Sequence, residues 1–154
     1  MASLAKPHDD LPDSVLFACN LNSVRSPMAE AIGKFLFGHK IFFDSVGVKT
    51  DAIDPFVIAV MDEIGIDISG HEAKSFDDLE DTSFDLVISL TPEAQHQAVE
   101  LTRTMACDVE YWPTFDPTIA TGSREHILDA YREVRDALMD RIKSRFNSGK
   151  AAEV

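Results

Sequence analysis

The feature that most constrains the fold of this chain is the stretch of residues 15–28, VLFACNLNSVRSPM. It begins with a short apolar run, which is typical of a strand buried in a sheet. Cys19 stands at the carboxyl end of that run, and a polar segment follows that ends at Arg25. Ser26 and Pro27 then open a helical pattern, with Ser expected at the N-cap and Pro in the first turn. The stretch therefore predicts a strand, a tight loop and a helix, in which Cys19 begins the loop and Arg25 ends it.

A loop of this kind is suited to binding a phosphate group. Its backbone N–H groups converge on a helix N-terminus, where the helix dipole favours an anion. Arg25 can hold two phosphate oxygens with its guanidinium, and the same positive environment favours the thiolate form of Cys19, which is the reactive form. The pattern therefore suggests displacement at phosphorus, with Cys19 as the nucleophile. The other residues predicted to surround the anion are Asn20, Leu21, Asn22, Ser23, Val24 and Ser26.

A simpler interpretation of this stretch competes with the phosphate loop. A cysteine can end a core strand as a small buried apolar residue, and an arginine can lie on a solvated helical turn. A cysteine and an arginine at this spacing also occur together by chance. The simpler interpretation accounts neither for the polar segment between the two residues nor for the helix cap, so the phosphate loop is the better hypothesis.

The composition allows one domain and argues against some classes of partner. The chain has 154 residues, 45% of them hydrophobic, so we expect a single domain over residues 1–154 with its core at about 14–146. The net charge of −13 argues against nucleic acid and anionic membranes as partners. The two cysteines are far apart and form no disulfide framework, and residues 1–13 lack the long apolar core of a secretion signal. We therefore expect a reduced, cytoplasmic protein.

Strand and helix patterns alternate along the rest of the chain. Apolar runs predict strands at residues 15–18, 41–43, 84–90 and 107–111. Helical spacing predicts helices at residues 28–37, 56–64, 92–105 and 123–145. Strands that alternate with helices imply right-handed crossovers and a parallel sheet. We therefore expect an α/β fold, a three-layer α/β/α sandwich with a four-stranded parallel sheet.

A catalytic rim is predicted where these strands end, because ligands in such folds bind beyond the carboxyl ends of the strands. Cys19, Ser45, Thr91 and the loop 112–121 all follow predicted strands. Displacement at phosphorus needs a proton donor opposite the nucleophile, and Asp116 in that loop is the candidate. On spacing alone, the alternative of a common turn-forming Asp-Pro pair stays open.

The loop and its flanks resemble a known family. A strand, Cys19, five residues, Arg25, Ser26 and then Pro-Met-Ala-Glu-Ala closely resemble the low-molecular-weight protein tyrosine phosphatases and the thioredoxin-linked arsenate reductases that share their fold. The resemblance covers about residues 15–146. It implies a phosphotyrosine protein phosphatase I-like fold and hydrolysis through a phosphocysteine intermediate, with no cofactor. It also implies a general acid in an Asp-Pro pair beyond the fourth strand, which here is Asp116.

Two further motifs carry the resemblance. Ser45 lies in Asp-Ser-Val-Gly, similar to the family's Ser-Ala-Gly, and His71 lies in Gly-His-Glu-Ala-Lys, similar to Gly-His-x-Ala-Arg. In the family these positions form a polar network that fixes the loop, and Asn22 is expected to support it because Asn tolerates left-handed backbone geometry. Without the resemblance, His71 is better interpreted as a surface-loop histidine. The other Asp-Pro pair, Asp54 and Pro55, is interpreted as a helix cap.

The chain departs from the family pattern at several places. Val24 stands where the phosphatases usually carry a second cysteine, so a protective disulfide within the loop is lost. Thr91 stands where they often have an acidic residue, and residues 118–120, Thr-Ile-Ala, replace a pair of aromatics that grip a phosphotyrosine ring. Trp112 and Phe115 can still supply an aromatic wall, although core packing is the expected use of Trp112. These departures bear on phosphotyrosine preference more than on phosphatase chemistry.

We therefore expect a cysteine-dependent phosphatase that acts on a phosphorylated protein, such as one with phosphotyrosine, or on a small aryl phosphate or other phosphomonoester. A phosphate or sulfate-like oxyanion is expected in the loop. No metal is required, and the sequence contains no evident cluster of metal ligands. A non-catalytic phosphate-binding module is a further hypothesis, but the presence of Cys19, Arg25, Ser26 and Asp116 argues against it.

Arsenate reduction is the competing enzymatic hypothesis. Arsenate mimics phosphate, and the helix at residues 123–146 is if anything more similar to the reductase branch of the family. Thioredoxin-linked reductases need two more cysteines soon after the third strand, and residues 89–97, SLTPEAQHQ, contain none. Cys107 is expected to be a small buried hydrophobe. Only a reduction that uses an external low-molecular-weight thiol remains open.

Overall fold

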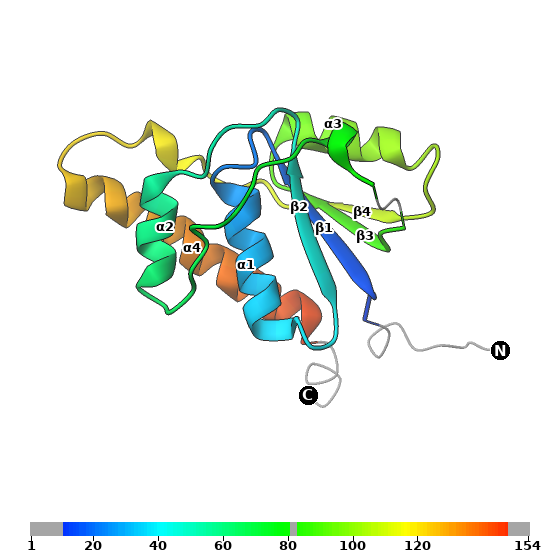
Figure 1. Cartoon of the computed structure of the whole chain (residues 1–154), viewed down its shortest axis with the longest axis horizontal. Helices are drawn as coiled ribbons and strands as arrows, with labels where there is room; N and C mark the ends of the chain where they lie inside the picture. The colour runs from blue at the N-terminus through cyan, green and yellow to red at the C-terminus, as the bar shows by residue number, and fades with distance from the viewer. Residues whose placement is uncertain (1–10, 81–82, 148–154) are drawn as a thin grey trace.

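The structure is a computed structural model that describes residues 11–80 and 83–147, so both ends of the predicted domain lie outside the described residues. Strands and helices alternate along the chain (Figure 1). The strands are β1 (Ser14–Cys19), β2 (Phe42–Gly47), β3 (Leu86–Ser89) and β4 (Asp108–Tyr111). The helices are α1 (Arg25–Phe37), α2 (Pro55–Asp62), α3 (Pro92–Leu101) and α4 (Arg124–Phe146), with short 3₁₀ turns η2 (Phe76–Asp78) and η3 (Pro117–Ile119).

The four strands form one parallel sheet in the order β2-β1-β3-β4. β1 is central and pairs with β2 on one side and β3 on the other. Helices α1, α2 and α4 cover one face of the sheet and α3 covers the other (Figure 1). The predicted three-layer α/β/α sandwich with a four-stranded parallel sheet is therefore confirmed.

The side chains of β1 alternate between the two faces of the sheet, as the period of a strand requires. Val15 and Phe17 pack in the larger core with α1, α2 and α4, whereas Leu16 and Ala18 pack in the smaller core with α3. All four side chains are fully buried. Because β1 is fixed by packing on both faces, its carboxyl end, where Cys19 lies, has a fixed position in the molecule.

Strand β2 is longer than its apolar run predicts. Residues 44–47 pair with residues 16–19 of β1, so Ser45 lies inside the strand and not after it. Gly47 ends the strand and has no room for a side chain, because a Cβ there would lie 2.7 Å from the backbone nitrogen of Asn22. The sequence places this polar segment after the strand, but it belongs to the strand, and its last residue packs against the loop that follows β1.

Most predicted helix starts are confirmed, but that of α1 is different. Asp54, Thr91 and Ser123 each accept a hydrogen bond from a backbone N–H in the first turn of the helix that follows. Ser26, in contrast, is not an N-cap, because α1 begins at Arg25 and Ser26 lies within its first turn. The hydroxyl of Ser26 faces Cys19 instead of the backbone of its own helix.

Two further predictions about the helices are wrong. The apolar spacing of residues 28–37 predicts that Phe35 packs on the sheet, but Phe35 is 63% exposed. The close contact of α1 with the sheet is made at Gly33, where a Cβ would lie 2.8 Å from the ring of Phe43. Helix α3 ends at Leu101, before the predicted end at about residue 105.

No helix in the described part of the chain is long and apolar enough to cross a membrane.

Candidate active site

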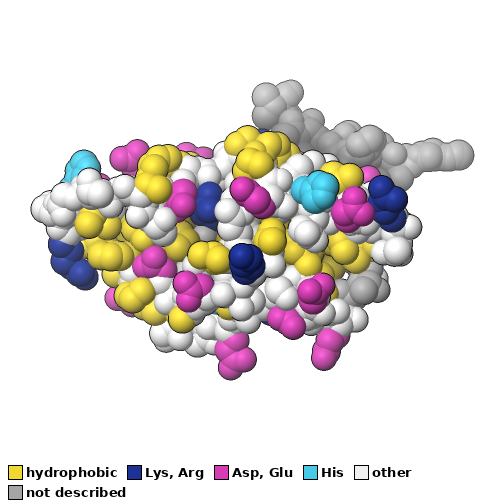
Figure 2. All heavy atoms as spheres, turned by 90° about the horizontal axis from the view of Figure 1, so that it is seen from above, with side chains coloured by type: hydrophobic (Ala, Val, Ile, Leu, Met, Phe, Trp, Pro, Cys, Tyr) yellow, Lys and Arg dark blue, Asp and Glu magenta, His cyan; other side chains and the backbone are white. Residues whose placement is uncertain are grey.

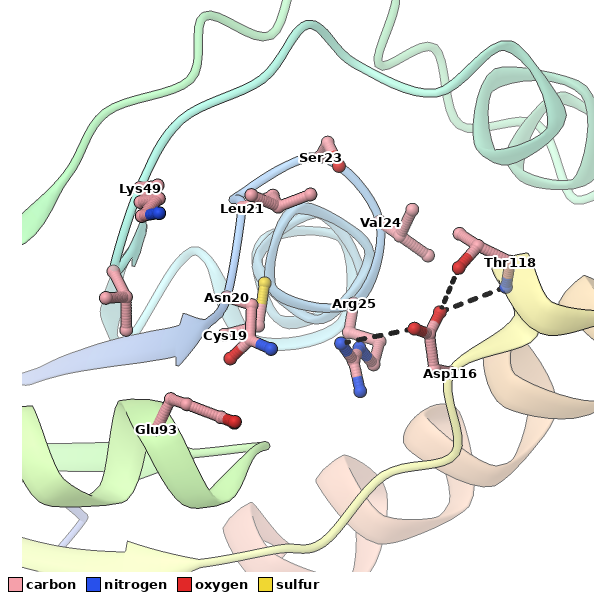
Figure 3. Close-up of a pocket in the computed structure, with 11 residues that line it drawn as sticks. Cys19, Asn20, Leu21, Ser23, Val24, Arg25, Lys49, Glu93, Asp116 and Thr118 are labelled. Atoms are coloured by element: carbon pink, nitrogen blue, oxygen red, sulfur yellow. Dashed lines mark hydrogen bonds and ion pairs between the residues drawn. The ribbon is translucent and has the colours of Figure 1, made fainter.

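The loop between β1 and α1 surrounds one side of a cavity of about 360 Å³ (Figure 3). Cys19 ends β1 and Arg25 begins α1, so sheet and helix hold the two ends of the loop. The cavity is lined by Cys19, Asn20, Leu21, Ser23, Val24, Arg25, Val48, Lys49, Glu93, Asp116 and Thr118. The structure therefore brings the predicted nucleophile, the predicted phosphate ligand and the predicted acid to one cavity.

The thiol of Cys19 lies at the floor of this cavity. The residue is only 2% exposed, but it lines the cavity and its sulfur is in polar contact with the start of α1. Sγ lies 2.9 Å from the Ser26 hydroxyl and accepts a hydrogen bond from the Ser26 backbone N–H at 3.4 Å. A thiolate here would be stabilised by both donors and by the helix dipole.

Arg25 and Asp116 meet across the cavity, although they are far apart in the sequence. Arg25 Nη1 donates to the carbonyl oxygen of Thr114 at 3.1 Å, which ties the guanidinium to the loop after β4. Arg25 Nη2 lies 3.9 Å from Asp116 Oδ2. Asp116 Oδ1 accepts two hydrogen bonds from Thr118, from its backbone N–H at 3.0 Å and from its hydroxyl at 2.7 Å. Thr118 thus fixes one oxygen of the carboxylate, and the other oxygen faces Arg25.

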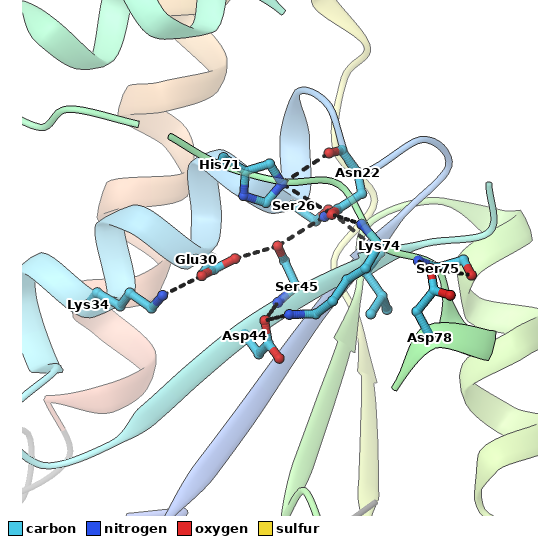
Figure 4. A network of polar contacts seen from close by, with 11 residues as sticks. Asn22, Ser26, Glu30, Lys34, Asp44, Ser45, His71, Lys74, Ser75 and Asp78 are labelled. Carbon is cyan, nitrogen blue, oxygen red and sulfur yellow. Dashed lines mark hydrogen bonds and ion pairs between the residues drawn. The ribbon is translucent and has the colours of Figure 1, made fainter. Parts of the chain in front are cut away.

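Behind the loop, Asn22 makes a closed set of hydrogen bonds (Figure 4). Asn22 has a positive φ of 55°, as predicted for an Asn in left-handed geometry, and it is fully buried. Its side-chain nitrogen donates to the hydroxyls of Ser26 at 2.8 Å and Ser45 at 2.9 Å. Its Oδ1 accepts from the backbone N–H of Lys74 at 2.9 Å and lies 3.1 Å from Nε2 of His71. Every polar atom of this side chain therefore has a partner within the chain.

These contacts determine where several protons lie. Nε2 of His71 is close to both oxygens of Asn22, which only accept, so the imidazole carries its proton on Nε2. The Ser45 hydroxyl donates to Glu30 and accepts from Asn22. The Ser26 hydroxyl also accepts from Asn22, so its own proton is available to Cys19 Sγ, with the carbonyl of Val46 at 3.2 Å as the other acceptor.

The charge around the cavity is not strongly positive. Arg25 and Lys49 line the cavity together with Glu93 and Asp116, so basic and acidic side chains are balanced there. Figure 2, which views the molecule from above relative to Figure 1, shows acidic side chains with basic side chains between them on the surface. The chain as a whole has a net charge of −13. An anionic ligand must therefore be held by the donors of the loop and by Arg25, because long-range attraction does not favour it.

Several predictions about the rim need correction or addition. Ser45 does not line the cavity; it is buried behind the loop. Trp112 and Phe115 do not form an aromatic wall at this cavity, because Trp112 is only 3% exposed and Phe115 lines a separate hollow beside α4. Aliphatic side chains from the loop and from the segment after β2 take that place. Sequence reasoning also missed Thr118 as the partner of Asp116.

Asp54 belongs to the structure of α2 and not to the cavity. One carboxylate oxygen caps the helix by accepting from the Phe56 backbone N–H at 2.8 Å. The other accepts from the Tyr131 hydroxyl at 2.8 Å, which ties α2 to α4. Burial, followed by this hydrogen bond, raises the pKa of Tyr131 well above its usual value. The interpretation of Asp54 as a cap is confirmed.

In the described part of the chain, no group of three or more His, Cys, Asp or Glu side chains is arranged to hold a metal ion.

Fold and site together define a class of protein: a three-layer α/β domain whose first strand–helix loop places a cysteine and an arginine at one cavity. The sequence model described as "Low molecular weight phosphotyrosine protein phosphatase" matches residues 14–148 of the chain. The chain belongs to this family.

The individual proteins that resemble this chain include arsenate reductases and a tyrosine phosphatase. A glutaredoxin arsenate reductase from Synechocystis sp. is 33% identical over an alignment of 137 residues that covers 84% of this chain and 93% of the relative. The solved structure of an arsenate reductase in the phosphate binding state is 31% identical, with a TM-score of 0.68 over 88% of this chain and 97% of that one. The crystal structure of a tyrosine phosphatase from Erwinia amylovora has a TM-score of 0.72 over 90% of this chain and 93% of that one, and at 18% identity it shows the same fold.

Proposed function

We propose that the protein is a cysteine-dependent phosphatase that hydrolyses phosphomonoesters through a phosphocysteine intermediate. The observation that carries this proposal is the placement of Asp116, whose Oδ1 is held by Thr118 while Oδ2 lies 3.9 Å from Arg25 Nη2 at the cavity of Cys19. A nucleophile at the floor and an acid at the wall are the two groups that displacement of an alkoxide or phenoxide from phosphorus needs. A module that only binds phosphate has no use for the acid.

In the first step the Cys19 thiolate attacks phosphorus. The S–P bond forms while the bond from phosphorus to the ester oxygen breaks. Arg25 and the N–H groups of the loop bind the nonbridging oxygens, whose charge they stabilise in the transition state. Asp116 gives the proton on Oδ2 to the departing ester oxygen, so the product leaves as an alcohol or phenol.

In the second step water attacks the phosphocysteine. The Asp116 carboxylate takes a proton from the water as the new O–P bond forms and the S–P bond breaks. The sulfur leaves as a thiolate, which accepts hydrogen bonds from the hydroxyl and the backbone N–H of Ser26. Inorganic phosphate is released, and Asp116 is again protonated for the next cycle.

The side chains that line the cavity indicate which class of substrate it can bind. Leu21, Val24 and Val48 supply aliphatic surface, while Lys49 and Glu93 supply one charge of each sign at the cavity. This surface suits the apolar body of an aryl phosphate, either a phosphotyrosine side chain of a protein or a small molecule. A thiol nucleophile requires a reducing compartment, so we place this single-domain enzyme in the cytoplasm.

Arsenate reduction with an external thiol is the second candidate, favoured by the arsenate reductases among the relatives. In that reaction arsenate and two thiols give arsenite, one disulfide and water, and Cys19 would form the bond to arsenic. The chain cannot supply the second sulfur itself. Cys107 directly precedes β4, and the pairing of Asp108 with Leu86 and of Leu86 with Val15 puts it five residues away from Cys19 along the strands. That is about 16 Å, well beyond the reach of a disulfide.

Cys107 is also chemically unsuited to that role. It packs against the core beneath α3, on the other face of the sheet from Cys19. Burial, together with the charge of Asp108, raises the pKa of the Cys107 thiol, so the unreactive thiol form is favoured. The prediction of a small buried hydrophobe at Cys107 is met in part, because the side chain packs against the core but is only partly buried.

Steady-state assays of the purified chain separate the candidates. With 4-nitrophenyl phosphate we expect turnover, and an acid quench followed by intact-mass measurement should show one added phosphoryl group that is absent from Cys19→Ser. Arsenate turnover with glutathione in the absence of aryl phosphate turnover would replace the phosphatase by the reductase. Binding of inorganic phosphate with neither activity would leave only the binding module.

A further inference from the structure

Asn20, the first residue after Cys19, has a side chain that the loop itself does not use. It is half-buried and lines the cavity (Figure 3). Its Oδ1 accepts a hydrogen bond of 2.7 Å from the hydroxyl of Thr91, which is only 2% exposed. Thr91 lies beyond β3, so the contact joins two strand ends that are 71 residues apart in the sequence.

The proton of Thr91 determines how the amide of Asn20 is turned. Thr91 Oγ1 already accepts from the Ala94 backbone N–H at 3.1 Å, as the N-cap of α3. Its single proton is therefore donated, and the group that receives it must be the oxygen of the amide. The NH₂ group of Asn20 then faces the cavity, and Figure 3 shows its nitrogen directed to the side on which Arg25 lies. Among the described residues, no acceptor lies within hydrogen-bond distance of that nitrogen.

The side chains of Asn20 and Asn22 differ in how many of their polar atoms are hydrogen-bonded within the chain. Asn22 is fully buried and uses both its N–H bonds and its oxygen within the chain. Asn20 uses only its oxygen. A fixed amide donor that points into a partly buried cavity beside a nucleophile is the arrangement that stabilises a developing oxyanion.

We propose that Nδ2 of Asn20 donates a hydrogen bond to a nonbridging oxygen of the phosphoryl group as it moves between the ester and Cys19, and that Thr91 is the positioning residue for this amide. The inference rests on the proposed phosphate chemistry of Cys19. Asn20 adds a side-chain donor to the backbone donors and to Arg25, on the side of the cavity next to α3. Thr91 acts without touching the substrate.

The first test removes the amide. Asn20→Leu keeps the shape of the side chain but has no donor, and we expect kcat/KM for 4-nitrophenyl phosphate to fall about 10- to 100-fold. Inhibition by inorganic phosphate and by orthovanadate should weaken in the same direction, more for vanadate because it adopts five-coordinate geometry on a thiolate. Asn20→Ala serves if the first variant does not fold. If kcat/KM and both inhibition constants stay within about twofold, the proposal is overturned.

The second test turns the amide around. Thr91→Asp retains a good N-cap for α3 but offers only acceptor oxygens, so the NH₂ group of Asn20 would turn toward it and Oδ1 would face the phosphate. We expect kcat/KM to fall at least as much as in Asn20→Leu. Thr91→Ser retains the hydroxyl and should therefore keep the phosphate affinity of the wild-type chain.

The added negative charge of Thr91→Asp could by itself lower kcat/KM. The double variant with Asn20→Leu separates this effect from the turned amide. In the Asn20→Leu background, Thr91→Asp should change kcat/KM by less than about threefold if it acts through the amide. If it lowers kcat/KM equally in both backgrounds, the positioning role is wrong.

The outcome of these tests is separate from that of the proposed function. If the wild-type chain neither turns over aryl phosphate nor binds inorganic phosphate in calorimetry, the proposed function fails and the inference fails with it. If the wild-type chain binds phosphate without turnover, the calorimetric affinities of Asn20→Leu and Thr91→Asp still test the donor. Turnover that is insensitive to both variants overturns the inference alone.

Discussion

The two sides of the loop between β1 and α1 use their polar groups in opposite ways. On the rear side, Asn22, Ser26 and Ser45 are fully buried and their side chains are paired with other groups of the chain. On the cavity side, Arg25 and Asp116 lie 3.9 Å apart, beyond hydrogen-bond distance, and the amide nitrogen of Asn20 faces the cavity. The rear side is complete without a ligand, whereas the cavity side has donors in excess.

This difference shows how the loop can be rigid while donors on its cavity side have no partner. Donors that converge without a partner would relax or collapse if the backbone were free to move. The rear network prevents that, because Asn22 ties the middle of the loop to β2 and to the segment around Lys74. We infer that the rear side contributes mainly to stability and preorganisation and that the cavity side contributes mainly to binding and chemistry.

The largest expected effect is on the cavity side. Cys19→Ser replaces the thiolate by a neutral hydroxyl, so aryl phosphate turnover should fall by about 10⁴-fold or more. The rear network keeps Ser26 and Asn22 in place, and inorganic phosphate should still bind, as measured by calorimetry. Turnover within tenfold of wild type would show that Cys19 is not the nucleophile.

The second-largest expected effect is the loss of kcat when Asp116, the proposed general acid, is replaced. Asp116→Asn retains the hydrogen bonds from Thr118 but has no proton to give, so kcat should fall about 10²- to 10³-fold for phenyl phosphate. The loss should be smaller for 4-nitrophenyl phosphate, whose leaving group needs less protonation. The rates are compared across a series of substituted phenyl phosphates.

A matched control for this prediction is the other Asp-Pro pair. Asp54→Asn retains the cap of α2, because Asn is also a good N-cap, and the side chain at this position does not line the cavity. It should leave the dependence on the leaving group unchanged. A loss for Asp116→Asn that is equal for all leaving groups would argue for a structural role of Asp116.

The fold could be predicted from the sequence because its signals are local. The apolar run before Cys19, the cap at Asp54 and the alternation of strands and helices each depend on a few neighbouring residues. Cys19 and Arg25 could be placed at one cavity for the same reason, since one loop carries both. The placement of Asp116 depended on the rule that ligands bind beyond the carboxyl ends of parallel strands.

The contacts that complete the site could not be predicted in this way, because they join distant segments. Nothing near Ser45 in the sequence indicates that its polar segment pairs with β1 as a strand. The hydrogen bond from Thr91 to Asn20 and the one from Arg25 to the carbonyl of Thr114 need the finished sheet. Ser26 looked like an N-cap because its sequence context fits one, but in the fold the same hydroxyl faces Cys19.

The third prediction separates backbone strain from side-chain contacts on the rear side. Asn22 adopts φ 55°, which costs a residue with a Cβ about 1–2 kcal/mol. Asn22→Gly removes the amide without adding strain, and losing its buried partners should lower the free energy of unfolding by about 2 kcal/mol. Asn22→Ala should be about 1 kcal/mol less stable than Asn22→Gly.

Urea unfolding measures both variants, and the assay of aryl phosphate measures what the rear side contributes to catalysis. We expect kcat/KM of Asn22→Gly to fall about 10- to 100-fold, because Ser26 and the loop donors are displaced. If stability falls while kcat/KM stays at the wild-type level, the cavity side does not depend on the rear network and the comparison is wrong.

The smallest effect is expected where neither side of the loop is touched. Glu63, just beyond α2, binds Arg132 and Arg135 of α4. Hydrogen bonds from Arg132 and then Arg135 lower the pKa of Glu63 from its ordinary value to about 2. A carboxyl group whose pKa is lower in the folded state stabilises the fold above its unfolded pKa of about 4.3 and loses that contribution as the pH falls toward 2.

Glu63→Gln should therefore lower the free energy of unfolding at neutral pH by only about 0.5–1 kcal/mol, since the side chain is partly exposed to solvent. The difference from wild type should be constant above about pH 5 and should shrink as the pH falls below 4. Glu63 lies at the end of α2 opposite to Asp54, whose backbone N–H donates to the loop carbonyl of Ser23, so kcat/KM at pH 7 should not change. Urea unfolding at several pH values checks the first part and the phosphatase assay the second. A loss of activity in Glu63→Gln comparable to that in Asn22→Gly would mean that general stability, and not the rear network, sets the geometry of the cavity.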